Sequence, residues 1–376
     1  MQVVSLKLRN YLSVQNEDVS LGRLNVLIGT NASGKSNVMD ALRFLRDAIR
    51  RDFQFAVTSR GGFVHLACKA SEAREVHLVT TFRDDDRAFE WSVCLSRREF
   101  DFRVREEVSL LHEGQPPVQV LKRTEDGAGW WWSGSEGEKV QLRERPEGSA
   151  LAAASADASF PARAVADFVR GWGFFDPNPG ALRRASAESD SSALAGYGQN
   201  LAARLHTLKR IDPERFERIR SAACDILGVP EKITFRTFDD GGRVALLFNE
   251  TGLRYRIHQA GGSSGTLRML AITTALLGTT RTLTGIEEPE AYIHPGALSA
   301  FTEHILRAEH GAQIVITTHS PQLLDVLDLP EAILLVRRTE SGTKVVGESD
   351  PQLVRTALDA SGFRLGEWHE TKGFGG

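Results

Sequence analysis

A glycine-rich segment near the N-terminus has the residue types and the spacing that phosphate binding requires. It reads G-x-x-x-x-G-K-S over residues 29–36, between the apolar run 24–28, which predicts a buried strand, and a stretch with helical apolar periodicity. Its glycines let backbone N–H groups converge on an anion, and the N-terminus of the next helix points at the same place. The alternative is an ordinary glycine-rich turn; the strand before it, the helix after it and the Lys-Ser pair favour the phosphate site.

This segment predicts a site for the phosphates of a nucleotide and for Mg²⁺. We expect the Lys35 ammonium to bridge the β- and γ-phosphates and the Ser36 hydroxyl to be a ligand of Mg²⁺. The residues predicted to bind the nucleotide here are Asn31, Ala32, Ser33, Gly34, Lys35, Ser36 and Asn37.

Two adjacent carboxylates follow an expected strand in the last third of the chain. The run Leu283–Ile286 is followed by Glu287-Glu288-Pro289-Glu290. Because ligands bind at the carboxyl ends of strands in open α/β sheets, we assign Glu287 to the Mg²⁺ shell and Glu288 to general-base catalysis on a hydrolytic water. An acidic surface turn is the alternative, and the phosphate-binding segment favours the catalytic interpretation.

Two further motifs lie on either side of this acidic turn. Small residues run into an expected helix at residues 261–268, where Ser263 and Gly265 could bind the γ-phosphate held by a second copy of the chain; a flexible linker that caps a core helix is the alternative. His319 ends an expected strand and could hydrogen-bond the γ-phosphate or the attacking water, although a lone histidine there is more often structural. We interpret His294 as structural.

The composition limits the class of protein. The chain has 376 residues, and its 46 Lys and Arg against 49 Asp and Glu give a formal charge of −3. This balance excludes a protein that coats nucleic acid through its overall charge, but it does not exclude a local basic groove. The cysteines, Cys68, Cys94 and Cys224, form no C-x-x-C pair, so we read neither a zinc site nor a disulfide framework and expect free thiols. No signal peptide or membrane span is apparent, so we expect a cytoplasmic protein without a membrane partner.

The order of expected elements predicts one α/β head over residues 1–376. We expect a phosphate-loop segment and an antiparallel β lobe in residues 1–145, with the β-rich pieces of that lobe after residue 75, a helical insertion in 146–230 with irregular stretches at 146–162 and 176–192, and the remaining motifs in 231–376. Within the insertion, Asp212 as N-cap, Pro213 at the first helical position and Gly228 at the end predict one helix. Within the last part, helices and strands alternate from residue 265 to 338, which is typical of a parallel sheet with crossover helices.

The motifs and their order resemble the ABC-type ATPase heads of the RecF/SMC group, and within it the compact bacterial "AAA family ATPase" proteins with S-x-G-T-L-R and E-E-P-E motifs. The resemblance is good in residues 1–50 and 255–325 and poor in the middle. It implies a P-loop NTPase fold of the ABC-ATPase type, with a mixed or parallel core sheet, an antiparallel β lobe and a helical insertion. It also implies ATP and Mg²⁺ as ligands and an ATP-dependent homodimer.

The resemblance assigns roles to the residues that match the motifs. Lys35 and Ser36 match the Walker A residues for phosphate and Mg²⁺, and the other matches are Glu287 as the Walker B acid, Glu288 as the catalytic base, Ser263 and Gly265 as the signature motif acting in trans, and His319 as the switch histidine. Two departures stand out: Ser264 replaces an acid common in relatives, and residues 57–66 hold no Q-loop glutamine.

Two functions remain open from the sequence. One is an ATP-hydrolysing dimer that does work in DNA maintenance, such as repair, or in anti-phage defence; the other is a nucleotide-gated interaction module that controls a separate effector, such as a nuclease, with slow turnover. A transport ATPase is disfavoured by the resemblance. Trp130-Trp131-Trp132 could stack on nucleic-acid bases, but alternate core packing in a strand is the favoured interpretation. Binding of DNA therefore stays an open expectation.

Overall fold

The computed structural model describes residues 1–69, 74–85, 87–99, 101–134, 138–142, 148–228, 232–238, 242–250, 252–309, 311–347, 354–356, 358 and 364–370. It divides into two compact units. The first comprises Met1–Trp172 and Ala332–Ser349, and the second comprises Gly173–Glu331 and Asp350–Gly376. Among the described residues, no helix combines the length and the apolar character needed to cross a membrane.

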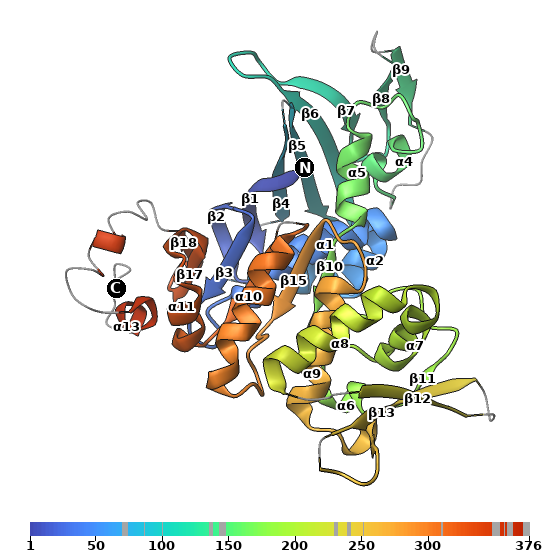
Figure 1. Cartoon of the computed structure of the whole chain (residues 1–376). Helices are drawn as coiled ribbons and strands as arrows, with labels where there is room; N and C mark the ends of the chain where they lie inside the picture. Colours follow the sequence, from blue (N-terminus) through green and yellow to red (C-terminus); the bar gives the residue numbers. More distant parts are fainter. Residues whose placement is uncertain are drawn as a thin grey trace. The chain divides into compact units, whose positions relative to one another are not determined.

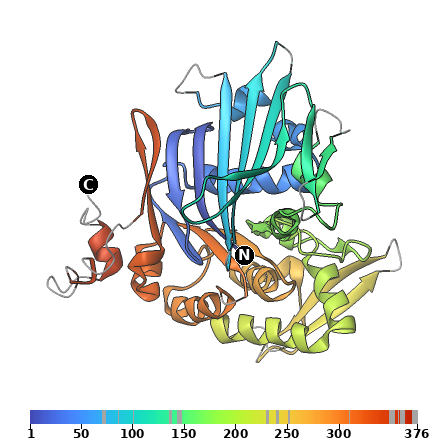
Figure 2. The same ribbon diagram turned by 90° about the horizontal axis from the view of Figure 1, so that it is seen from above.

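An eight-stranded antiparallel sheet dominates the first unit, in the order β2-β1-β4-β5-β6-β7-β8-β9 (Figure 2). Alternation explains why these residues form strands: along β4, Val76, Leu78, Thr80 and Phe82 are buried, whereas the residues between them are half-buried. The antiparallel sheet expected after residue 75 is therefore confirmed. The strands are β1 (Gln2–Tyr11), β2 (Val14–Ser20), β4 (Glu75–Asp84), β5 (Arg87–Arg97), β6 (Phe102–Leu111), β7 (Val118–Arg123), β8 (Gly129–Ser133) and β9 (Glu138–Gln141).

Three other strands of the first unit support the glycine-rich loop. All five residues of β3 (Leu24–Ile28) are buried, and β3 pairs in parallel with β17 (Ile333–Thr339), which pairs antiparallel with β18 (Gly342–Gly347). The helices of this unit are α1 (Lys35–Arg50), α2 (Phe53–Thr58), α3 (Phe63–Leu66), α4 (Ala150–Ala154) and α5 (Arg163–Arg170). Helix α1 packs through Phe44 against Tyr11 of β1, with ring centroids 6.0 Å apart.

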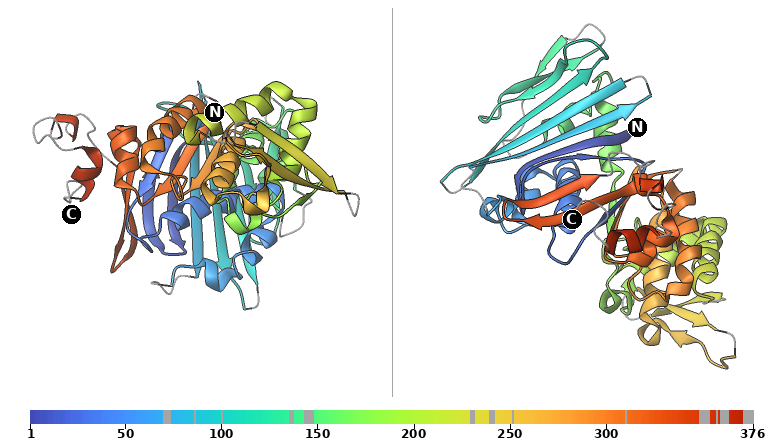
Figure 3. Two further views of the ribbon diagram at one scale, coloured as in Figure 1. Left: turned by 60° about the horizontal axis from the view of Figure 1, so that its bottom comes forward. Right: turned by 90° about the vertical axis from the view of Figure 1, so that its left-hand side faces the viewer.

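Parallel strands with crossover helices form the centre of the second unit. Strand β15 (Leu283–Glu287) pairs in parallel with β10 (Gly173–Phe175) and with β16 (Gln313–Thr318), so the parallel arrangement expected from the alternation is confirmed for these strands (Figure 1). Helices α10 (Leu298–Glu309) and α11 (Pro321–Leu327) flank β16 in sequence. Helix α13 (Leu365–Glu370) lies at the C-terminal end of the chain, drawn in red in Figure 3. A hydrogen bond of 2.6 Å from the Gly366 N–H to Asp325 Oδ1 joins it to α11.

The rest of the second unit is a helical cluster on a small antiparallel sheet. The helices are α6 (Pro179–Leu182), α7 (Leu201–Ile211), α8 (Pro213–Leu227) and α9 (Ser264–Leu277), and the strands are β11 (Ser186–Ala187), β12 (Lys232–Phe238), β13 (Arg243–Asn249) and β14 (Ile257–His258). Helix α8 begins and ends as the sequence predicts, because the Asp212 side chain accepts from the Arg215 N–H and Gly228 closes the helix in a left-handed conformation.

The stretches expected to be irregular contain short elements. Helix α4 lies in the Ala/Ser-rich stretch 146–162, and α6 and β11 lie in 176–192. The reason for α4 is a tertiary contact: the buried Glu106 carboxylate accepts hydrogen bonds from the N–H groups of Ala150 and Leu151 at the start of this helix. A five-residue helix lacks the length to be stable alone, so a partner outside the segment decides its structure.

Candidate functional site

The glycine-rich loop joins buried β3 to α1, as the sequence predicts. Gly34 caps α1 with φ 110°, and Ala32 has φ 60°, so the loop takes left-handed backbone at two positions. Lys35 is the first helical residue and is buried, and its Nζ donates to the carbonyl oxygens of Gly29 at 2.7 Å and Thr30 at 2.9 Å. The loop therefore curves around the ammonium group, which is the charge that phosphates require.

Strands β17 and β18 explain why two loop positions are glycine. A Cβ on Gly29 would lie 2.0 Å from the Val336 carbonyl oxygen, and one on Gly34 would lie 2.1 Å from Thr343 Oγ1. Thr343 also donates to the Ser33 carbonyl oxygen at 2.8 Å, and so fixes the loop from behind. Thr343 is a residue that the sequence analysis missed, because no local pattern links it to a loop some 300 residues earlier.

The remaining loop residues fit a phosphate group and a Mg²⁺ ion. Within the described part of the chain, the buried Ser33 hydroxyl has no hydrogen-bond partner, which suits a ligand rich in acceptor oxygens. Asn31, Ala32 and Ser36 are exposed at the top of the loop and the start of α1, where a hydroxyl can reach a metal ion. Asn37 instead donates to Ser13 Oγ at 2.5 Å, so it holds the β1–β2 turn.

The acidic turn in the second unit has unusual backbone. Glu287 ends β15 opposite Thr317, and the next residue, Glu288, has φ 42°, which is uncommon for a residue other than glycine. The Glu288 N–H donates to the Thr317 carbonyl oxygen at 2.9 Å and holds this conformation. The Glu288 side chain is 49% exposed, and its Oε1 lies 3.0 Å from Nε2 of His319. The structure thus brings together the carboxylate and the histidine that the sequence analysis singled out separately.

Glu290 ties the acidic turn to the end of β16. Its Oε1 accepts from the Thr318 hydroxyl at 2.5 Å and from the His319 N–H at 3.4 Å. Burial raises the pKa of the Glu290 carboxyl, whereas the hydrogen bonds from Thr318 and His319 act to lower it. This third carboxylate had no predicted role, although its place in the E-E-P-E motif is visible in the sequence.

Arg268 of α9 holds the same turn from the other side. Its guanidinium is 5% exposed and donates to the carbonyl oxygens of Glu287 at 2.8 Å and Glu288 at 2.9 Å. It also donates to the Pro177 carbonyl oxygen. Where α9 begins, a Cβ on Gly265 would lie 2.6 Å from the Tyr292 carbonyl oxygen, so this glycine allows close contact with the chain that follows the acidic turn. The small-residue motif and the acidic turn are therefore directly connected.

Ser263 is the N-cap of α9. It is exposed, and its Oγ accepts from the Thr266 N–H at 3.0 Å. Arg183 donates to the Ser264 hydroxyl at 2.9 Å, so the serine that replaces the common acid has a defined partner. A 14-residue helix with an exposed serine at its N-terminus offers N–H groups and a partial positive charge to an anion.

Three other predicted features have structural roles. His294 is exposed and accepts from the Gly296 N–H at 3.1 Å, so it caps a turn. Arg60, in the segment without a Q-loop glutamine, makes ion pairs with Asp40 of α1 at 2.7 Å and with Asp47 at 3.3 Å. The tryptophans 130–132 lie in β8, so the predicted strand is confirmed, but all three are half-buried and do not alternate between core and solvent as expected.

The predicted site residues fall into two groups by unit. The glycine-rich loop, with Lys35 and Ser36, belongs to the first unit, whereas the acidic turn, His319 and the start of α9 belong to the second. Within each unit the structure brings the predicted residues together. The roles assigned to them remain predictions.

Two family models match the chain. The model described as "AAA domain, putative AbiEii toxin, Type IV TA system" matches residues 132–325, which is more than half of the chain. The model described as "AAA ATPase domain" matches residues 1–145. No curated protein matches the chain in sequence.

Solved structures of SMC heads share its fold. An SMC head bound to the C-winged helix domain of ScpA is 14% identical with a TM-score of 0.57, and the match covers 94% of this chain and 99% of that one. The Pyrococcus furiosus head with an extended coiled coil, bound to the C-terminal domain of ScpA, is 14% identical with a TM-score of 0.54, and the match covers 96% of this chain and 99% of that one. The Thermotoga maritima head domain is 11% identical with a TM-score of 0.50, and the match covers 93% of this chain and 100% of that one. The chain therefore belongs to the AAA domain family whose model matches residues 132–325, and it has the fold of an ABC-type ATPase head of the RecF/SMC group.

Proposed function

We propose that this chain is a Mg²⁺-dependent ATPase that dimerises with a second copy on binding ATP and does work in DNA maintenance or anti-phage defence. The observation that carries the proposal is the Glu288 carboxylate, on left-handed backbone at the end of a strand and 3.0 Å from His319. Uncommon backbone at a polar strand end is a feature of functional sites. A carboxylate oriented by an imidazole suits proton abstraction from water.

Each unit supplies its own residues to the proposed reaction. The glycine-rich loop would bind phosphate oxygens through its N–H groups and Lys35, and Ser36 and Glu287 would hold Mg²⁺, which neutralises phosphate charge when bound. Glu288 would accept the proton of the attacking water, and His319 would orient Glu288 or that water. Arg268 and Glu290 would fix the position of the turn that carries Glu288.

The N-terminus of α9 supports a second copy as the partner. Ser263 is exposed there, and its N–H-rich surroundings suit the γ-phosphate of an ATP bound by the other copy. SMC heads of this fold are described bound to domains of ScpA, which supports a partner protein as well. A separate effector such as a nuclease would be such a partner if ATP binding, and not turnover, is the signal.

The test separates ATP binding from hydrolysis on one preparation. Lys35→Ala should lose ATP binding, since it removes the cation that faces the phosphates. Glu288→Gln should keep ATP binding, lose phosphate release by about 10²–10⁴-fold, and accumulate as a dimer in Mg·ATP. Calorimetry, phosphate release and sedimentation velocity measure these three properties.

Glu303→Gln is the matched control, because Glu303 is an exposed carboxylate on α10 that pairs only with Arg307 at 3.1 Å among the ion pairs of the described residues. It should behave as the wild type. Hydrolysis at the wild-type rate by Glu288→Gln would show that Glu288 is not the base.

The wild type distinguishes the two candidate functions. Stimulation of its ATP hydrolysis by DNA would support work on DNA, and a long-lived wild-type dimer with slow turnover would support the nucleotide-gated module instead.

A further inference from the structure

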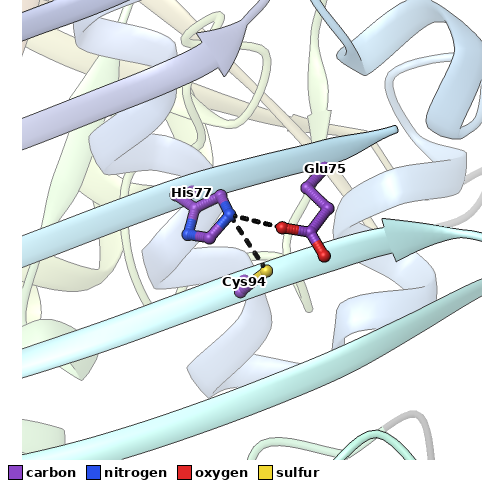
Figure 4. A group of neighbouring side chains, drawn as sticks. All are labelled: Glu75, His77 and Cys94. Carbon is purple, nitrogen blue, oxygen red and sulfur yellow. Dashed lines mark hydrogen bonds and ion pairs between the residues drawn. The ribbon is translucent and has the colours of Figure 1, made fainter. Parts of the chain in front are cut away.

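Three side chains with metal-binding atoms lie on one face of the antiparallel sheet in the first unit. Glu75 and His77 are two residues apart on β4, so both side chains point to the same face. His77 lies directly opposite Cys94 of β5 in the strand register, which places the thiol on that face as well. Figure 4 shows the imidazole and the carboxylate turned toward each other, with the sulfur next to them.

The donor atoms converge on one point. His77 Nε2 lies 2.9 Å from Glu75 Oε2 and 3.3 Å from Cys94 Sγ, and one donor atom from each residue lies within 4.8 Å of the other two. A tetrahedral Zn²⁺ ion with Zn–N near 2.0 Å and Zn–S near 2.3 Å requires ligand atoms about 3.4–3.6 Å apart. Small side-chain movements would therefore admit an ion without a change in the backbone.

The surroundings of the cluster give a metal ion access from solvent and offer a place for a water ligand. Cys94 is buried, while Glu75 and His77 are partly exposed, so an ion can enter from solvent. Ser96 lies opposite Glu75 on the same face, and within the described residues its buried hydroxyl has no hydrogen-bond partner. A water molecule in the fourth coordination position of a metal ion could form a hydrogen bond with this hydroxyl.

Arg105 of β6 shows that this cluster attracts a cation. It lies opposite Cys94 in register and approaches Cys94 Sγ at 3.2 Å and Glu75 Oε1 at 3.3 Å. Its side chain is 45% exposed and also lies 3.7 Å from Glu125, so it has another partner when an ion takes its place. A metal ion would compete with this guanidinium.

We propose that Glu75, His77 and Cys94 form a binding site for a divalent transition-metal ion of the Zn²⁺ type. Thiolate, imidazole and carboxylate are together the donors that Zn²⁺ takes in proteins, whereas Mg²⁺ prefers oxygen alone. The thiolate and the carboxylate balance the charge of the ion. The sequence predicts no zinc site, because it holds no closely spaced cysteine pair; here the sheet brings together ligands from two strands.

The test uses Co²⁺ as a spectroscopic probe and Zn²⁺ as a competitor on the full, untagged chain. One equivalent of Co²⁺ should produce thiolate-to-metal charge-transfer absorption, and Zn²⁺ should remove it by displacement. Cys94→Ser should lose the absorption, and Glu75→Gln and His77→Gln should bind at least about tenfold more weakly. Arg105→Gln should bind more tightly because it removes the competing cation, and such a gain cannot arise from misfolding.

Cys224→Ser is the matched control. Cys224 is a half-buried free thiol on α8 in the second unit, and its loss should leave the Co²⁺ spectrum and the Zn²⁺ affinity unchanged. Thermal unfolding without metal establishes that each variant is folded, and Zn²⁺ should raise the melting temperature of the control but not of Cys94→Ser. A wild-type Co²⁺ complex without thiolate absorption, or Zn²⁺ affinity unchanged in Cys94→Ser, would overturn the proposal.

Discussion

Replacing Arg268 with methionine tests how the acidic turn is held. Methionine keeps a long apolar stem and removes the guanidinium, so the carbonyl oxygens of Pro177, Glu287 and Glu288 lose a charged donor. Each such bond contributes about 1.5–3 kcal/mol when the partner is left unsatisfied, but Glu288 is exposed and water can replace part of the loss. The contact with Asp176 is 3.5 Å long to a half-exposed carboxylate and contributes little. We expect Arg268→Met to lower the free energy of unfolding by about 3 kcal/mol.

Urea unfolding followed by circular dichroism measures this loss. Arg307→Met is the control, because Arg307 is 70% exposed on α10 and pairs with Glu303 one helical turn away, so its loss should cost less than about 0.5 kcal/mol. The variant should also release phosphate more slowly than the control at a temperature where both are folded, since Glu288 loses its support. A cost below about 1 kcal/mol for Arg268→Met would refute the argument that these carbonyl oxygens depend on the guanidinium.

Two further predictions concern α9 and the buried carboxylate of β6. Ser263→Asp keeps a good N-cap for the Thr266 N–H but brings a negative charge to the proposed γ-phosphate position. Light scattering should therefore show loss of the ATP-dependent dimer, while the stability of the fold and the affinity for ATP stay unchanged. An undisturbed dimer would contradict the proposed contact with the γ-phosphate bound by the other copy. Burial raises the pKa of Glu106 above its ordinary value of 4.5, against the attraction of Arg123. A raised folded-state pKa contributes stability that is full below the unfolded value and lost as the pH rises through the folded value. The wild type should therefore lose stability relative to Glu106→Gln between about pH 4 and neutrality, and urea midpoints showing a relative gain would contradict this sign.

The elements with local causes were predictable from the sequence. The glycine-rich loop lies between a buried strand and an amphipathic helix, all within about 30 residues, so its spacing alone predicted the strand, the phosphate-binding turn and the helix start near Lys35. The helix after Asp212 was predicted for the same reason, because its N-cap, its proline and its terminal glycine act on neighbouring backbone groups. The β4 strand was visible from its alternation.

Features that depend on distant residues, such as α4 and the backbone at Glu288, were not predictable in this way. The Ala-rich turn of α4 has weak local signals, and its start depends on Glu106, more than 40 residues earlier. Likewise, nothing near Glu288 in the sequence indicates its left-handed backbone, because a bond to the Thr317 carbonyl oxygen on the neighbouring strand holds it. These features depend on contacts with segments far away in the chain, which the residues on either side do not encode.

The sequence by itself determined which chemical groups are available and which local elements carry them: the loop with Lys35, the strand that ends at Glu287, and the capped helix after Ser263. Short-range hydrogen bonding and side-chain periodicity set those elements, and both act over a few residues. Only the tertiary structure decided the partners of these groups. It brought the His319 imidazole next to the Glu288 carboxylate and the Arg268 guanidinium next to the carbonyl oxygens of the acidic turn. It also assembled the Glu75–His77–Cys94 cluster from two strands. Such contacts join residues up to tens of positions apart, and the packing of strands and helices selects them.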